Sequence, residues 1–141
     1  MTLWGSNYYG LSIQYRDLLV ATGGNPVSQK DNVVPGSDMA GEIVSLGAEV
    51  KGWVPCERVC ANLSIDYIFG DITLANMDTS LGAPIDGVLT EYKVLPAHVS
   101  PAPLHHFPLT RLNDVAQSLV RIPEHLSYEE ASTLPCAALT T

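Results

Sequence analysis

Glycine and proline divide this chain into short apolar runs, and this punctuation limits the possible folds more than any other feature. The 141 residues include 11 glycines and 10 prolines, which end helices and strands or form the turns between them. The runs between them are typical of short strands, at residues 39–46, 59–61, 88–94 and 119–123. Such strands, joined by glycine-rich turns, predict a mainly β fold with short helices, in the form of a small, partly open β-barrel.

Two short helices are expected beside these strands. Residues 15–22 have the apolar spacing of a short helix, which Gly23 ends because glycine accepts the left-handed cap conformation. Ser127 and Glu130 form a capping box, since each side chain can bind the other residue's backbone N–H. This box predicts a second helix that continues to about Leu134.

Composition bounds the class of protein and of partner. A length of 141 residues suits one domain, and 46% hydrophobic residues are enough for a core. The net charge of −8 argues against nucleic acid and anionic membranes as partners. No apolar stretch approaches the roughly 18 residues of a membrane span. Three sparse cysteines and an opening without a signal-peptide pattern predict a cytoplasmic location.

Five runs, taken together and in this order, resemble a known family. They are YRDLLVATGG, VVPGSDMAGEIVSLGAEVKGW, ERVCAN, IDGVLTEYKVLPAH and LVRIPEHLSYEEASTLPCAALT. They look like the N-terminal half of the medium-chain dehydrogenase/reductases, in the zinc-free, quinone-oxidoreductase-like branch of the alcohol dehydrogenase superfamily. The resemblance covers most of residues 11–98 and 118–141. It implies a GroES-like, partly open β-barrel.

The resemblance also implies a site without zinc. Zinc-dependent members of the family hold their catalytic metal at positions that match Gln14, Ser37 and Cys136. Catalytic zinc needs three good protein ligands, and only Cys136 is one. We expect Cys136 to be a buried, small hydrophobic residue instead.

Without a metal, other donors must stabilise the negative charge that hydride transfer leaves on a substrate oxygen. The resemblance places Gln14, Tyr15 and Arg16 at the cleft as catalytic candidates, and Ser37 and Thr140 beside the cofactor, NADP or NAD. The substrate would be a small quinone, enone or carbonyl compound.

Each candidate also has a purely structural interpretation, which the sequence leaves open. Tyr15 could pack against other side chains, and Arg16 could pair with Asp17 or another acid on the helix. Ser37 and Asp38 could form a turn with a local side-chain hydrogen bond.

The family's dinucleotide-binding half has no counterpart among these motifs. No G-x-G-x-x-G spacing follows a predicted strand, and in the family the Rossmann domain begins after the LPCAALT run. Residues 1–141 are therefore expected to be the GroES-like, substrate-side domain with the Rossmann cofactor domain absent, and to be inactive alone. The apolar inter-domain face would then be exposed and could support self-association.

Three departures from the family pattern stand out. Residues 99–117 interrupt it and are expected to be a foreign or disordered insertion, either a retained intron or a natural surface loop. Pro55 and a missing glycine put the geometry of the turn at residues 53–58 in doubt. The first ten residues do not match the family's opening strands, so the barrel is expected to be incomplete and to lack an edge.

Three accounts of the chain follow from these observations. It could be the substrate-side domain of an NAD(P)H-dependent, zinc-independent oxidoreductase. It could instead be a non-catalytic β-barrel that acts as a binding or interaction module. It could also be the product of a truncated gene prediction, without a stable fold.

Overall fold

A computed structural model describes residues 3–26, 29–48, 50–67, 71–96 and 118–139. The insertion predicted at residues 99–117 lies outside these ranges. The strands are β1 (Leu3–Ser12), β2 (Asp38–Ser45), β3 (Arg58–Ala61), β4 (Tyr92–Pro96) and β5 (Leu119–Arg121). The helices are α1 (Tyr15–Thr22), α2 (Leu74–Met77), α3 (Tyr128–Ser132) and the 3-10 turn η1 (Ala137–Leu139). This content confirms the predicted fold class, mainly β with short helices.

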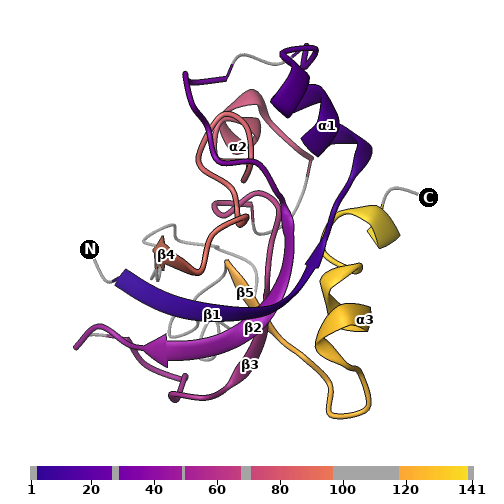
Figure 1. Cartoon of the computed structure of the whole chain (residues 1–141). Helices are drawn as coiled ribbons and strands as arrows, with labels where there is room; N and C mark the ends of the chain where they lie inside the picture. The colour runs from indigo at the N-terminus through magenta and orange to yellow at the C-terminus, as the bar shows by residue number, and fades with distance from the viewer. Residues whose placement is uncertain (1–2, 27–28, 49, 68–70, 97–117, 140–141) are drawn as a thin grey trace.

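The five strands form one curved sheet in the order β4-β1-β2-β3-β5, and each neighbouring pair is antiparallel. In the described part of the chain, the outer strands β4 and β5 do not pair with each other, so the barrel is open, as predicted. Helix α3 packs against β1 and β2, while α1 and α2 are drawn in the upper part of the view, beyond the sheet (Figure 1). No helix in the described ranges is long and apolar enough to cross a membrane.

Strand β1 corrects the expectation that the opening residues leave the barrel without an edge. This strand lies inside the sheet, where Ser12 pairs with Asp38 of β2 and Leu3 pairs with Pro96 of β4. A register shift follows Tyr8, and a β-carbon on Gly10 would lie 2.6 Å from the backbone oxygen of Tyr128. The strand therefore depends on partners far away in sequence, which local patterns do not reveal.

Both predicted helices are present. Helix α1 ends at Gly23, which has a φ of 72° and donates its N–H to the last turn of the helix. At α3 the capping box is confirmed, because Glu130 N donates to Ser127 Oγ at 3.2 Å and Ser127 N donates to Glu130 Oε2 at 2.9 Å. This helix ends at Ser132, slightly earlier than predicted.

The strand predicted at residues 88–94 is only partly correct. Strand β4 covers Tyr92–Pro96, and the residues before it form a separate contact. Gly87 N donates to Val34 O at 2.6 Å, and Leu89 N donates to Pro35 O at 3.1 Å. Because these backbone groups bind the segment before β2, they do not extend β4.

Two hydrophobic clusters lie on opposite faces of the sheet. The main cluster contains nine buried side chains, Met39, Ile43, Trp53, Val59, Ala61, Leu81, Val88, Leu95 and Leu119. The second lies under α3 and contains Ala40, Cys60, Ile122 and Ala131. Adjacent residues of β2 and β3 fall in different clusters, as the alternation of side chains along a strand requires.

The turn at residues 53–58 forms despite its missing glycine. Cys56 takes the left-handed conformation, with a φ of 65°, and Glu57 N donates to Val54 O at 3.3 Å. The turn is bonded to β2, since Cys56 N donates to Ile43 O at 2.7 Å. A cysteine therefore occupies a backbone conformation that favours glycine.

Candidate functional site

The site begins where α1 leaves β1. The buried carboxylate of Asp17 accepts the N–H of Gln14 at 2.8 Å and the N–H of Gly36 at 3.1 Å. Gln14 Nε2 donates to Ser12 Oγ at 2.9 Å. Asp17 thus ties the start of the helix to the segment that leads into β2. The sequence reasoning missed this role, although an acid three residues after a helix N-cap is the usual signal for it.

Ser37 and Asp38 follow directly, and neither has solvent-exposed surface. Ser37 Oγ donates to Asp38 Oδ2 at 2.9 Å, so the predicted local hydrogen bond is present, but at the start of β2 rather than in a turn. Cys136 N donates to Asp38 Oδ1 at 2.7 Å. Asp38 therefore joins the start of β2 to the C-terminal segment, 98 positions away in sequence.

Burial is the largest influence on the Asp38 carboxyl and raises its pKa above 3.8. The hydrogen bonds from Ser37 and Cys136 oppose this rise, while the nearby charge of Asp17 adds to it. Burial, followed by the charge of Asp38, also raises the pKa of the Cys136 thiol above 9.0. Cys136 is therefore a half-buried, neutral thiol at pH 7.

Arg16 supplies the positive charge of the site. Arg16 Nη2 donates to the backbone oxygen of Leu81, and the Asp17 carboxylate accepts hydrogen bonds from two backbone N–H groups. The expected alternative, in which Arg16 pairs with Asp17, is therefore wrong. The charge of Arg16 opposes the rise in the pKa of both Asp38 and Cys136, which places it within electrostatic reach of each.

The structure brings together most of the predicted site residues. Gln14 N donates to Asp17 and Ser37 Oγ donates to Asp38, and the charge of Arg16 acts on Asp38. Tyr15 is 74% exposed, so the alternative in which it packs among other side chains is wrong. Thr140 lies outside the described residues.

An apolar hollow of about 240 Å³ opens beside this group. Its lining includes Asp17 and Gly36. Ile13, Leu18 and Leu89 also line it, and they are 78%, 55% and 52% exposed. Large apolar side chains therefore face solvent next to the buried polar site.

The residues at the matched metal positions do not fit catalytic zinc. Gln14 offers an amide and Ser37 a hydroxyl already bonded to Asp38, and neither is an ordinary zinc ligand, so Cys136 is the one suitable ligand of the three. Zinc binds thiolate, imidazole or carboxylate ligands. The described residues contain no group of three or more His, Cys, Asp or Glu side chains placed to hold a metal. The zinc-free site nevertheless stays a prediction.

Comparison with known proteins gives a consistent match. The profile of the alcohol dehydrogenase GroES-like domain matches residues 8–104. A zinc-type alcohol dehydrogenase-like protein of Schizosaccharomyces pombe is 37% identical over 129 residues, which are 92% of this chain and 32% of that protein.

Solved structures agree with this match. A Sinorhizobium meliloti structure assigned as an alcohol dehydrogenase is 30% identical, has a TM-score of 0.74, and is matched over 99% of this chain and 36% of its own. The yhdH oxidoreductase of Salmonella enterica, solved with NADP, is 17% identical with a TM-score of 0.60, over 94% of this chain and 30% of its own, and so supports the fold alone. The chain spans about a third of the length of these proteins.

Proposed function

The chain belongs to the alcohol dehydrogenase GroES-like domain family, and from that premise we propose that it is the substrate-side domain of an NAD(P)H-dependent, zinc-independent oxidoreductase. The substrates are quinones, enones or other carbonyl compounds, reduced by hydride transfer. One observation carries the proposal. The positions that match metal ligands hold an amide, a hydroxyl and a neutral thiol, grouped with the buried Asp38 and Arg16.

These residues suit a reaction in which negative charge develops on a substrate oxygen. The bound nicotinamide supplies the hydride, and the protein must then stabilise the oxyanion. Arg16 is a fixed positive charge, and burial strengthens its interaction with a nearby anion. Gln14 has an amide with two N–H donors, of which Ser12 uses one. Polar groups aimed at a substrate oxygen would take over the role of a metal.

The surroundings of the site support a cleft between two parts of a larger protein. The hollow rimmed by Ile13, Leu18 and Leu89 would face the substrate and the cofactor-binding part. Thr140 and Ser37 would lie beside the nicotinamide, which is NADP or NAD. The chain would be inactive alone, because the dinucleotide-binding fold is not among its motifs.

A chimera tests the proposal. The chain is joined to the part of the Sinorhizobium meliloti relative that it does not cover, and NADPH oxidation is followed with 9,10-phenanthrenequinone. We expect turnover by the chimera, no turnover by the 141-residue chain, and no loss of rate with the zinc chelator 1,10-phenanthroline. A chimera that binds NADPH and unfolds cooperatively yet does not reduce the quinone would contradict the proposal. Loss of turnover on chelation would contradict its zinc-independent part.

A further inference from the structure

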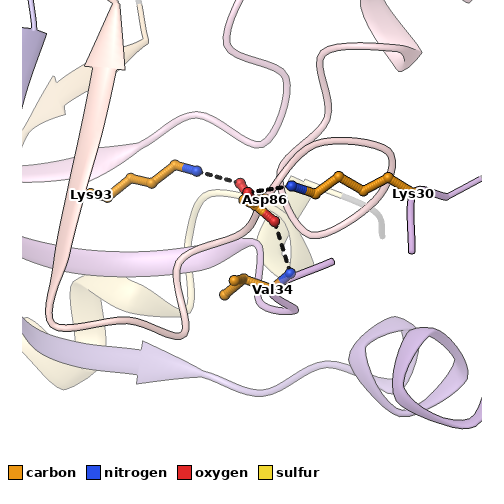
Figure 2. Close-up of polar contacts among 4 residues, drawn as sticks. All are labelled: Lys30, Val34, Asp86 and Lys93. Atoms are coloured by element: carbon orange, nitrogen blue, oxygen red, sulfur yellow. Dashed lines mark hydrogen bonds and ion pairs between the residues drawn. The ribbon is translucent and has the colours of Figure 1, made fainter. Parts of the chain in front are cut away.

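Asp86, in the segment that leads into β4, is bonded to Lys30 and Val34, more than 50 positions earlier in sequence, and to Lys93 in β4 itself (Figure 2). Its Oδ2 accepts from Lys30 Nζ at 2.5 Å, and its Oδ1 accepts from Val34 N at 3.0 Å. Lys93 Nζ donates to the backbone oxygen of Asp86 at 2.5 Å. Figure 2 shows the two lysine side chains reaching Asp86 from opposite sides. Since Lys93 belongs to β4, these contacts anchor the segment around Val34 to the edge of the sheet.

The residues beside Asp86 continue this contact toward the site. Gly87 N donates to Val34 O at 2.6 Å, and Val88 N donates to Gly36 O at 3.0 Å. The two backbones are so close that a β-carbon on Gly87 would lie 2.1 Å from Gly36 O. The path of the chain up to Gly36 is therefore fixed by the segment that Asp86 begins.

Ser37 and Asp38 come directly after Gly36, so their positions depend on that path. We propose that Asp86, which accepts from Val34 N and whose backbone oxygen is bound by Lys93, is a positioning residue for the Ser37–Asp38 site. It acts through backbone contacts and touches neither substrate nor cofactor. The link to catalysis rests on the proposed function. Whether Asp86 positions Ser37 and Asp38 can be measured without any ligand.

The competing interpretation is an ordinary surface ion pair. The side chains of Lys30 and Asp86 are 51% and 39% exposed, and an ion pair at that exposure contributes little to stability. An ion pair alone would have no effect on Cys136, whose N–H binds Asp38 on the far side of the site. The exchange of this amide with solvent therefore separates the two interpretations.

The experiment compares amide hydrogen exchange in the 141-residue chain, by NMR, for Asp86→Ala, Asp86→Asn and Lys30→Met. Lys51→Met, at an exposed lysine in the turn after β2, is the charge-matched control. Each Cys136 rate is divided by the rate of the Ile122 amide, which donates to Arg58 O and reports on a distant part of the sheet. This ratio removes any uniform loss of stability.

We expect Asp86→Ala to raise the Cys136 ratio by about tenfold, the size of effect expected for loss of a hydrogen bond to a charged group. Asp86→Asn keeps an oxygen that can accept from Val34 N, so it should rescue most of the protection. Lys30→Met and Lys51→Met should change the ratio by less than about twofold.

An unchanged ratio in Asp86→Ala would overturn the inference, as would an equal effect of Lys30→Met. If Asp86→Ala does not fold, Lys93→Met is held to the same criterion, because it frees the Asp86 backbone from β4 and leaves the carboxylate in place. No cofactor or quinone is present, so failure of this inference and failure of the proposed function are separate results.

Discussion

Replacing Gly87 with alanine should destabilise the protein by about 2–4 kcal/mol, because two backbone segments pass each other at this glycine. An added β-carbon would lie 2.1 Å from Gly36 O and 2.4 Å from Pro35 O. An ordinary contact begins at 3.4 Å, so the segments would have to separate by 3.4 − 2.1 = 1.3 Å. Neither obstacle is the end of a flexible side chain, so the backbone itself must move.

Such a separation breaks the hydrogen bonds that join the two segments. The three bonds are donated by Gly87, Val88 and Leu89, with N to O distances of 2.6, 3.0 and 3.1 Å. At about 1 kcal/mol for each neutral bond, losing two or three gives about 2–3 kcal/mol. Val88 is fully buried in the main cluster, and its displacement adds to the loss. This sum gives the expected range.

Urea unfolding followed by circular dichroism measures the effect, with Gly24→Ala as the matched control. The nearest atom to a β-carbon on Gly24 is Leu19 Cδ2, at 3.4 Å, so this substitution should change stability by less than about 0.5 kcal/mol. If Gly87→Ala were as mild as Gly24→Ala, the close approach of the two segments would be refuted, and with it the positioning of the Ser37–Asp38 site.

Three further predictions follow from single residues. Cys56→Gly should raise the free energy of unfolding in urea by about 0.5–1 kcal/mol, since the left-handed conformation costs a cysteine about 1–2 kcal/mol and the greater freedom of glycine in the unfolded chain offsets part of the gain. Asp38 has a folded pKa above its unfolded value of 3.8, so the folded state binds more protons between the two values and stability falls as pH rises through that window. Asp38→Asn should remove this fall in urea titrations at successive pH values, and an unchanged pH profile would count against the buried carboxyl. Burial and the Glu42 carboxylate raise the pKa of Tyr128 to about 12, from 10.0. Stability should therefore fall between these two pH values, and Tyr128→Phe should flatten the fall in alkaline unfolding curves while losing about 1–2 kcal/mol at pH 7 with the hydrogen bond to Glu42.

Helices α1 and α3 were predictable because their signals are local, whereas α2 and η1 were not predicted. Helix α1 covers the predicted residues 15–22 and ends at Gly23, and α3 begins at the predicted capping box. A cap needs only residues within three or four positions, all of which the sequence displays.

The sheet was less predictable, because its hydrogen bonds join residues far apart in sequence. Strand β1 contains glycine, serine and asparagine, which are poor strand formers, yet it lies between β2 and β4. Residues 88 and 89 have apolar side chains like those of a strand, yet their N–H groups bind Pro35 and Gly36. Periodicity identifies segments that can form strands, but the partner decides which residues do.

The candidate site shows the same division between local and distant information. Ser37, Gln14 and Arg16 were identified from the family motifs, and the structure brings them together. The bond between the Cys136 N–H and Asp38 could not be predicted, because it depends on how the C-terminal segment packs against β2. The insertion at 99–117 and Thr140 lie outside the described residues, so those two predictions stay open.

The buried Asp38 gives the strongest physical reason to assign function to this part of the fold. Removing a carboxylate from water is unfavourable, and here burial outweighs the two hydrogen bonds that compensate it, as the raised pKa shows. A well-packed apolar side chain can be more stabilising than a charged group in such a position. A second buried acid, Asp17, adds to the electrostatic cost. A buried acid whose pKa is raised is typical of catalytic sites, and this arrangement therefore supports the proposed function better than it supports a purely stabilising role.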